Sequence, residues 1–415
     1  MVKVELSSRR PLLKSHLRQA NDRLLLNLIR QSSDLSRADI MRLTGFPASS
    51  VTYIVKRIMS AGLVYETRSE RPSRVGRQPV MLRLKPEALI AAGVEILRSG
   101  ARIILADLHG AILAQRAVPW EASHMIFLVR VREALRALTS NIGGRLLGVG
   151  VSLPGTINRN TGYVFAAENL GWFEIDAGGI LAEGATAKFY FGNDAHLGAL
   201  AERWFCEPGG KPLENFVYVV LREGLGTGVV LEGSLLLGAS GEASEFGHTT
   251  LYPDGRRCLC GSTGCWEEYG SQRALERLYA ERQPAQGGQS ALNAEQIIQL
   301  ARHGDVPALA VLKETAGDLG LGFANLNAAF NPEAIVVGDY LAAAWDLMKD
   351  WVWDAVRLRA PQRQLRLLRI LPSRHGTDST ILGTVALVLS SFFAPSTLVR
   401  GPNEAEARSA VLPSP

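Results

Sequence analysis

The sequence predicts an α/β protein in which a small winged helix-turn-helix precedes a larger body of two similar lobes. Three observations favour this fold class. Apolar residues recur at helical spacing near the N-terminus, two short apolar runs flank an arginine-rich stretch before residue 85, and glycine-separated β-rich runs alternate with helical segments beyond it. A chain of 415 residues also exceeds one typical core, so two or three domains are expected.

Charge is distributed unevenly along the chain. Residues 1–85 carry 17 Lys and Arg against 6 Asp and Glu, a net charge of +11, whereas the remainder carries 28 against 34, a net charge of −6. A basic head on a slightly acidic body indicates that the head meets a polyanion. A solvated basic face without a partner is the alternative.

No secretory or membrane segment is expected. The sequence holds no apolar run of about 18 residues or more, and MVKVELSSRRPLLKSHLRQAND lacks the apolar centre of a signal peptide. We therefore expect a cytoplasmic protein without a membrane partner. Three of the 4 cysteines fall between residues 258 and 265 while Cys206 stands apart, which favours a metal or catalytic role over disulfides.

The head begins with a predicted helix over residues 21–30, for which Asn21 or Asp22 is the expected cap. The preceding residues 13–22 also look helical. They form either a plain N-terminal extension or a helix that packs the head on the body. We expect an extension over 1–22 and a winged helix-turn-helix over 23–85.

Two further helices joined by a tight turn complete the helix-turn-helix. Ser36 and Asp39 predict a capping box before the first, and Thr44-Gly45-Phe46 forms the turn. Pro47 suits the first position of the second helix and Gly62 suits its end. The expected buried stripe of the second helix is Val51, Ile54, Val55 and Ile58.

The other face of this second helix carries the candidate DNA contacts. Early hydroxyl side chains could reach base edges, and the later basic residues could hold phosphates. An ordinary solvent-exposed face is the alternative. The candidates are Ser49, Ser50, Thr52, Tyr53, Lys56 and Arg57.

A basic wing is predicted after the helices. Residues 63–66 and 80–84 read as two short strands, and TRSERPSRVGRQP lies between them. The piece RVGRQP resembles an AT-hook, in which arginines enter a narrow minor groove. Together with the helix-turn-helix this predicts binding to double-stranded DNA. The wing arginines are Arg68, Arg71, Arg74 and Arg77, the last three being candidate DNA contacts.

Residues 245–268, EFGHTTLYPDGRRCLCGSTGCWEE, contain a candidate metal site. One imidazole and three thiols make a complete Cys₃His set for tetrahedral zinc, with no position left for water, so one structural Zn²⁺ per chain is expected. Gly261 and Gly264 would let the backbone wrap round the ion. Unconnected buried cysteines are the alternative. The expected ligands are His248, Cys258, Cys260 and Cys265.

This stretch closely resembles the ROK family of repressors, open reading frames and sugar kinases, in its sugar-responsive repressor branch (xylose, glucose or N-acetylglucosamine). Other motifs agree in order: LPGTI at 153–157, ENLGW at 168–172, GNDAHLGALAE at 192–202, GLGTG at 224–228 and NPEAIVVGD at 331–339. The resemblance extends to about Phe393. It implies an actin-like, hexokinase-type body of two lobes over 86–393, with a sugar between them. We expect a disordered tail over 394–415.

The resemblance also implies a sugar site. Carboxylates and an amide would bond to vicinal hydroxyls, and His248 would bind zinc through one nitrogen and face the sugar with the other. Asn169 and Glu267 could instead only brace loops. The implied sugar residues are Gly155, Asn169, Asn193, Asp194, Glu245, His248 and Glu267.

Phosphoryl transfer is not expected, although Asp194 matches the general base of the family's kinases. Those kinases carry an Asp-x-Gly-x-Thr phosphate loop, and the equivalent Glu95-Ile96-Leu97-Arg98-Ser99 has Leu97 in place of the glycine. Val230 replaces a further glycine of a second loop, and Asp339-Tyr340 replaces a glycine-rich turn.

The resulting hypothesis is a DNA-binding repressor of carbohydrate genes whose operator binding responds to a sugar or sugar phosphate, acting as a homodimer or homotetramer. The sequence places no extra basic residue at the pocket mouth for a phosphorylated ligand. A bifunctional sugar kinase with a DNA-binding head is the alternative. A third reading is a DNA-binding protein whose body docks a protein partner instead of a sugar.

Overall fold

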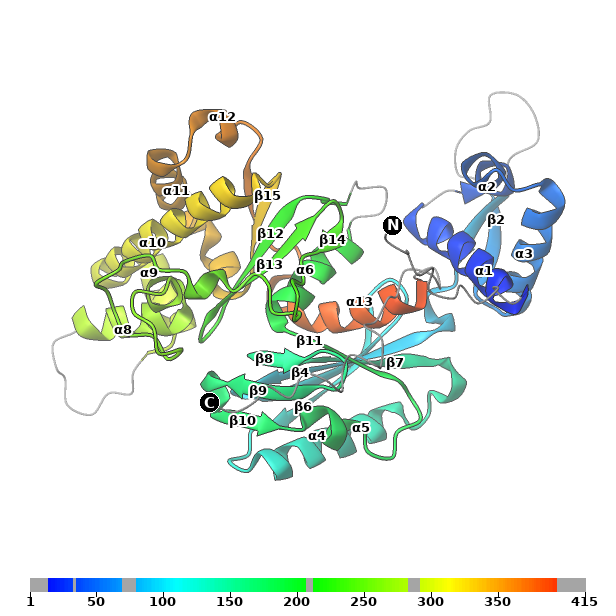
Figure 1. Ribbon diagram of the computed structural model, residues 1–415, viewed down its shortest axis with the longest axis horizontal. Coiled ribbons are helices and arrows are strands. Elements are labelled where there is room, and N and C mark those ends of the chain that lie inside the picture. Colours follow the sequence, from blue (N-terminus) through cyan, green and yellow to red (C-terminus); the bar gives the residue numbers. More distant parts are fainter. Residues whose placement is uncertain (1–13, 33–34, 69–79, 207–211, 283–291, 394–415) are drawn as a thin grey trace, which may run out of the picture. The chain divides into compact units, whose positions relative to one another are not determined.

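The structure is a computed structural model that describes residues 14–32, 35–68, 80–206, 212–282 and 292–393 (Figure 1). The chain divides into two compact units. We call residues 1–89, with 207–209 and 389–415, the head, and residues 90–206 and 210–388 the body.

The head contains α1 (Lys14–Gln31), α2 (Arg37–Thr44) and α3 (Ala48–Ser60). The first of these corrects two expectations. Helix α1 runs without interruption through residues 21 and 22, so neither Asn21 nor Asp22 is a cap and the boundary expected at 22/23 falls inside a helix. Residues 14–20 contain no Gly or Pro to stop the helix. Asp22 uses its carboxylate on Arg57 of α3 instead, with Nε–Oδ1 at 3.1 Å.

The helix-turn-helix forms as its sequence signals indicate. Ser36 Oγ accepts from the backbone N–H of Asp39 at 3.2 Å, and the Asp39 carboxylate accepts from the Ser36 N–H at 3.0 Å, which is a complete capping box. Pro47 occupies the cap position of α3, one residue earlier than expected. Gly62 has φ +72°, the left-handed conformation that glycine adopts without strain after a helix end.

A three-stranded sheet completes the head. β2 (Val64–Arg68) pairs antiparallel with β3 (Val80–Leu84), as expected of a wing, and β1 (Leu35–Ser36) adds a third strand on the other side of β3. The predicted loop between β2 and β3, with Arg71, Arg74 and Arg77, lies outside the described residues. The head core includes the expected stripe of α3 together with Leu25, Ile29, Ile40 and Leu82, all buried.

The first lobe of the body is built on a five-stranded sheet of order β11-β7-β4-β5-β6. Its elements are β4 (Ile90–Leu97), β5 (Gly100–Ala106), β6 (Ile112–Pro119), β7 (Leu146–Ser152) and β11 (Phe189–Gly192), with helices α4 (His124–Thr139) and α5 (Ala177–Ala182). A small antiparallel sheet of β8 (Thr156–Asn158), β9 (Tyr163–Ala167) and β10 (Trp172–Ile175) adjoins it.

The second lobe repeats this plan. Its sheet has the order β14-β13-β12-β15-β16, formed by β12 (Phe216–Leu221), β13 (Leu225–Leu231), β14 (Ser234–Leu235), β15 (Ala334–Val337) and β16 (Arg369–Pro372). The helices of this lobe are α7 (Glu267–Gly270), α8 (Gln272–Arg282), α9 (Ala294–Arg302), α10 (Val306–Phe330), α11 (Asp339–Arg359) and α12 (Gln362–Leu365).

Both large sheets follow one topology, which confirms the prediction of two similar lobes. In each, three consecutive antiparallel strands are extended by two parallel ones beside the first strand: β4 is flanked by β5 and β7, and β12 by β13 and β15. Each lobe has its own apolar core, around Phe127 in the first and around Trp266 and Phe323 in the second. Helix α6 (Asp194–Trp204) joins the two lobes in sequence, and α13 (Ser379–Phe393) follows β16 of the second lobe and packs on β4 and β7 of the first.

Helix α13 is apolar for a structural reason. Contrary to the expectation of no such stretch, residues 376–393 reach the length and mean hydropathy of a membrane span, but 61% of this stretch is buried inside the protein. Thr384 packs directly on Gly93 of β4 and Gly150 of β7, where any side chain would overlap the helix. The composition of α13 is therefore that of a core helix.

Candidate functional site

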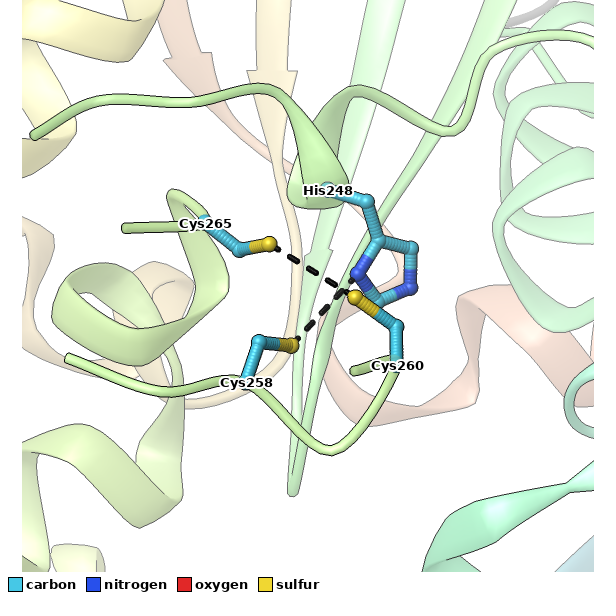
Figure 2. Close-up of side chains that lie close together, drawn as sticks. All are labelled: His248, Cys258, Cys260 and Cys265. Carbon is cyan, nitrogen blue, oxygen red and sulfur yellow. Dashed lines mark hydrogen bonds between the residues drawn. The ribbon is translucent and has the colours of Figure 1, made fainter. Parts of the chain in front are cut away.

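Three thiols and one imidazole converge in the second lobe (Figure 2). His248 ends the 3₁₀ turn Phe246–His248, and the cysteines come from the loop that precedes α7. The Cys260 and Cys265 sulfurs are 3.7 Å apart, as are the Cys258 sulfur and His248 Nδ1, and all four donor atoms lie within 4.8 Å of one another. The four residues that the sequence predicted as ligands thus form one group that could hold a metal ion.

The backbone around these residues is shaped for close approach. Gly264 has φ +76°, and a Cβ at this position would overlap the carbonyl of Tyr252. Isolated bridges pair Thr250 with Cys265 and Arg257 with Thr263, so the loop folds back on itself as a narrow ribbon. The Cys258 N–H donates to the Ser262 carbonyl at 2.9 Å, which closes the turn that carries Cys260.

Glu267 connects this group to the strands of the second lobe. Its Oε1 lies 3.0 Å from the Cys258 sulfur and 3.8 Å from His248 Nδ1. Its Oε2 accepts from the N–H of Leu225 at 3.4 Å, at the start of β13. A displacement of the cysteine loop would therefore move a carboxylate that also holds the turn between β12 and β13.

A pocket opens where the two lobes of the body face each other. The space between its walls is about 250 Å³, a figure that includes space open to solvent. Three of the sugar residues implied by the resemblance, Gly155, Asn193 and Glu245, line it. The full lining is Gly155, Thr156, Ile157, Arg159, Asn193, His196, Gly241, Glu242 and Glu245.

Three of the four remaining implied sugar residues lie near the turn that joins β12 and β13 or near the start of β13. Asn169 and Glu267 both lie against Gly224, and the Asp194 carboxylate lies near Gly226. His248 sits with the cysteines. The structure thus places three of the seven in the pocket, three near this turn or the start of β13 and one in the Cys/His group.

Burial dominates the electrostatics of this region. It raises the pKa of Asp194, although the positive charge of Arg222 acts in the opposite direction. It also raises the pKa of Glu245, against the effect of His248. Asn193 caps helix α6 through its Oδ1, which accepts from the Ala195 N–H at 2.9 Å, and its Nδ2 donates to the Gly155 carbonyl at 3.3 Å. These bonds fix the amide at the pocket wall.

Six of the nine lining residues were not among the predicted sugar residues, and two of these six, His196 and Arg159, matter for the chemistry of the pocket. His196 is two positions after Asp194 within GNDAHLGALAE, and Arg159 is two positions after LPGTI. Both therefore stood beside motifs that the resemblance had used, which was the available signal. Neither belongs to the set that the resemblance implied.

A buried ion-pair cluster lies where the sequence reading placed the phosphate loops. Arg222 Nη2 is 2.8 Å from Glu95 Oε1 and its Nε is 3.1 Å from Asp339 Oδ1. Although burial disfavours the charge, these carboxylates hold the pKa of Arg222 above its ordinary value. Burial raises the pKa of Asp339 to about 6, in spite of Arg222. Glu95 comes from the first lobe and the other two from the second, so the cluster cross-links the lobes.

The position expected to mark the second phosphate loop needs correction. Val230 lies inside β13, paired with Phe216 at the end of the strand remote from the turn. The turn itself is Arg222-Glu223-Gly224, because Leu221 pairs with Leu225 across it. Arg222, the first residue of this turn, is the one that takes part in the ion-pair cluster. Leu97 lies at the β4–β5 hairpin and pairs with Gly100.

The candidate DNA residues of α3 lie mostly on its open face. Ser49, Thr52, Tyr53 and Lys56 are exposed and Ser50 is half-buried. Arg57 is engaged within the head, because it pairs with Asp22 and its guanidinium carbon lies 5.2 Å from the Tyr53 ring centroid. Arg57 thus links α1 to the face of α3.

Fold and site together define an actin-like body of two lobes, with a ligand pocket and a Cys/His group, that carries a winged helix-turn-helix. The chain belongs to the ROK family, whose model matches residues 91–391, while residues 21–74 match the model of the MarR family.

Known relatives include both repressors and kinases. The xylose repressor of Bacillus spizizenii is 29% identical over 384 residues, which covers 91% of this chain and 97% of the repressor. A glucokinase of Streptomyces coelicolor is 30% identical over 273 residues, covering 63% of this chain and 85% of the enzyme. Among solved structures, a ROK family transcriptional regulator described as a homologue of the Escherichia coli Mlc protein has a TM-score of 0.77 at 24% identity, covering 91% of this chain and 97% of its own.

Proposed function

We propose that this protein is a DNA-binding transcriptional repressor of carbohydrate metabolism genes whose operator binding responds to a sugar. One observation carries the proposal: a winged helix-turn-helix and a ROK body with a ligand pocket occur in one chain. The relative that aligns over 91% of the chain is a xylose repressor, whereas the glucokinase aligns over 63%. A cytoplasmic homo-oligomer follows from this proposal, because paired half-sites on DNA require paired heads.

The DNA contacts are proposed on the open face of α3 and on the wing. Ser49, Ser50, Thr52 and Tyr53 would face base edges, and Lys56 would hold a phosphate. Arg57 would act chiefly by orienting Tyr53 and α1, since Asp22 already neutralises it. Arg71, Arg74 and Arg77 of the wing are proposed for the minor groove.

The Cys/His group is proposed to hold one structural Zn²⁺. Zinc–sulfur bonds of about 2.3 Å in a tetrahedron separate two sulfurs by roughly 3.8 Å, close to the 3.7 Å between Cys260 and Cys265. Nδ1 of His248 would be the fourth ligand, since it is the nitrogen that faces Cys258. When bound, the ion would fix the loop and, through Glu267, the turn that carries Gly224.

Sugar recognition is proposed for the pocket and the adjoining turn, with Asn193, Asp194, Glu245, His248 and Glu267 as the polar contacts and Gly155 and Asn169 at its border. Carboxylates and an amide match the donors and acceptors of vicinal hydroxyls. Lobe closure on the sugar would then change the spacing or mobility of the heads on DNA.

The ion-pair cluster supports a body without kinase activity. A phosphate group approaching Arg222 would have to displace Glu95 or Asp339 and would meet their negative charges. Leu97 also adds a side chain where the family's kinases approach phosphate through glycine. Asp339 stands where the resemblance implies a glycine-rich turn under adenosine. One observation favours the second candidate, a bifunctional sugar kinase: Asp194, the residue that matches the kinase base, is retained beside the pocket.

The test uses the full chain. Selection from a random duplex library should enrich a sequence with two half-sites, bound more weakly as salt rises. A thermal-shift screen of sugars should then find a stabilising sugar that also changes affinity for the enriched duplex at least tenfold. Ser49→Ala should weaken duplex binding, whereas Ser60→Ala, at the exposed far end of α3, should not. No enriched sequence, or no sugar with an effect on DNA binding, would contradict the proposal.

Two further arms separate the alternatives. Asp194→Ala should abolish the sugar-induced shift while leaving duplex binding intact. Formation of ADP from ATP and the sugar, lost in Asp194→Ala, would establish the kinase instead. Mass spectrometry under native conditions should find one zinc per chain, lost with Cys258→Ser but retained with Cys206→Ser, a matched thiol outside the Cys/His group.

A further inference from the structure

The pocket holds a guanidinium without a counter-charge. Arg159 follows β8 and lines the pocket together with Asn193 and Glu245. Among the residues that the structure describes, it forms neither an ion pair nor a side-chain hydrogen bond, and its Nε is buried without a partner. Burial is the sole cause that lowers the pKa of Arg159. The sequence reading placed no basic residue at the pocket, and the structure corrects that reading.

The two carboxylates that line the pocket, Glu242 and Glu245, form no ion pair with Arg159. Glu242 accepts a hydrogen bond from Ser240 Oγ at 3.0 Å, although it lines the same pocket. Glu245 also lines the pocket but forms no ion pair among the residues that the structure describes. The stem of Arg159 lies on Gly241, whose missing side chain leaves room for it. Among the described residues, Arg159 is thus held at the pocket by packing and not by an anion.

The pocket also offers a hydrogen-bond acceptor, on His196. His196 Nε2 is 3.0 Å from the Ala243 carbonyl, which can only accept, so Nε2 must carry the proton. Burial lowers the pKa of His196, which keeps the ring neutral and leaves Nδ1 as an acceptor. This Nδ1 is buried and has no hydrogen-bond partner within the part of the chain that the structure describes. An acceptor of this kind suits a ligand hydroxyl.

Resting on the proposed function, we infer that the effector is an anionic sugar, a monosaccharide whose phosphate ester or carboxylate pairs with Arg159. A half-buried cation without a partner is costly, and an anion in the pocket would relieve that cost through charge-assisted, forked hydrogen bonds. The hydroxyls of the same ligand would meet His196, Asn193 and Glu245. A neutral sugar would leave Arg159 uncompensated.

The experiment is titration calorimetry of the full chain with three matched ligand series: neutral pentoses and hexoses, their terminal phosphate esters, and the corresponding uronic and aldonic acids. At least one anionic sugar should bind ten times or more tighter than its neutral parent. Arg159→Gln should reduce that affinity by about ten- to hundredfold, the range of a lost charged hydrogen bond. Arg116→Gln, which removes an exposed arginine of β6 outside the pocket, should have no effect.

Stability without ligand distinguishes a binding role from a structural one. Arg159→Gln should melt at or above the temperature of the unchanged protein, because it removes a half-buried charge that has no partner. A lower melting temperature would overturn the assignment, since it would show that the protein uses this charge itself.

The remaining outcomes are separable. If a neutral sugar binds as tightly as every anionic one, or if Arg159→Gln binds the anionic sugar unchanged, the inference fails while the sugar-sensor function stands. If no sugar of any series binds, the proposed function fails as well. The phosphate and carboxylate series decide which anion the site prefers.

Discussion

Replacement of Arg222 by methionine tests whether the ion-pair cluster holds the two lobes together. Methionine keeps much of the length and packing of the stem but removes the charge between Glu95 and Asp339. Glu95 is fully buried and would keep only Arg102, whose Nη1 lies 3.6 Å from its Oε2. Asp339 would lose the positive charge that opposes the effect of burial.

The expected loss is large for a single substitution. Removing one partner of a buried ion pair costs about 3–5 kcal/mol, because the other charge stays buried. Arg102 compensates Glu95 in part, so we expect about 3 kcal/mol at pH 7.5. For a body of this size about 2 °C accompanies each kcal/mol, which gives a fall in melting temperature of roughly 6 °C. Asp339 has a pKa of about 6 beside Arg222 and a higher pKa without it, so the variant takes up protons first and the loss should shrink as pH falls toward about 6.

Scanning calorimetry of the full chain at pH 7.5 and 5.5 measures both effects. The matched control is Arg369→Met, which removes an exposed pair with Glu333 at 3.5 Å and should cost less than about 1 kcal/mol. Adding Glu95→Gln and Asp339→Asn to Arg222→Met should restore most of the stability. Unchanged melting of Arg222→Met, or no recovery in the triple variant, would refute the cross-link.

Three further predictions concern local packing, capping and protonation. Gly322→Ala should destabilise the body by about 3 kcal/mol or more, because its methyl group would overlap the Trp266 indole. The control, Gly317→Ala on the same helix, meets no neighbouring atom and should stabilise the body by about 0.5–1 kcal/mol. Equal melting temperatures of the two variants would contradict this prediction. Ser36→Ala removes the capping box and should lower the free energy of unfolding of the head by about 1 kcal/mol, measured by thermal unfolding. An unchanged unfolding midpoint would refute this expectation. Burial raises the pKa of Asp318 to about 6. As pH rises from about 4 to about 6, the unfolded chain loses this proton before the folded protein does, so the free energy of unfolding should fall over that range. Calorimetry should show that the Asp318→Asn variant loses less stability over this pH range than the unchanged protein. Parallel curves of stability against pH for the two proteins would count against this prediction.

Local signals allowed much of the fold to be predicted. The capping box at Ser36, the stripe of α3 and the two repeated lobes depend on residues close together in sequence or on regular spacing. The continuity of α1 was not predicted, because Asp22 is a good cap in isolation and only its pairing with Arg57, 35 residues later, shows its actual role.

The candidate site likewise has parts that local sequence predicts and parts that depend on residues far apart in the chain. The Cys/His group could be predicted because its ligands crowd into one loop, with His248 a few residues before it. The cluster at Arg222 could not, since Glu95 lies 127 residues away and belongs to the other lobe. The role of Arg159 also escaped prediction, because a cation is recognised as unpaired only when the positions of all nearby carboxylates are known.

The end of α13 has a consequence for modularity. Its last residues are part of the head, where the guanidinium carbons of Arg23 and Arg30 lie 5.9 and 5.8 Å from the ring centroids of Phe392 and Phe393. The DNA-binding unit is therefore discontinuous in sequence. An N-terminal fragment ending at residue 89 would lack two aromatic rings of its own unit, so the head cannot be moved to another protein complete by transferring residues 1–89 alone. An insertion or deletion anywhere in the body changes the length of chain between two parts of one folding unit.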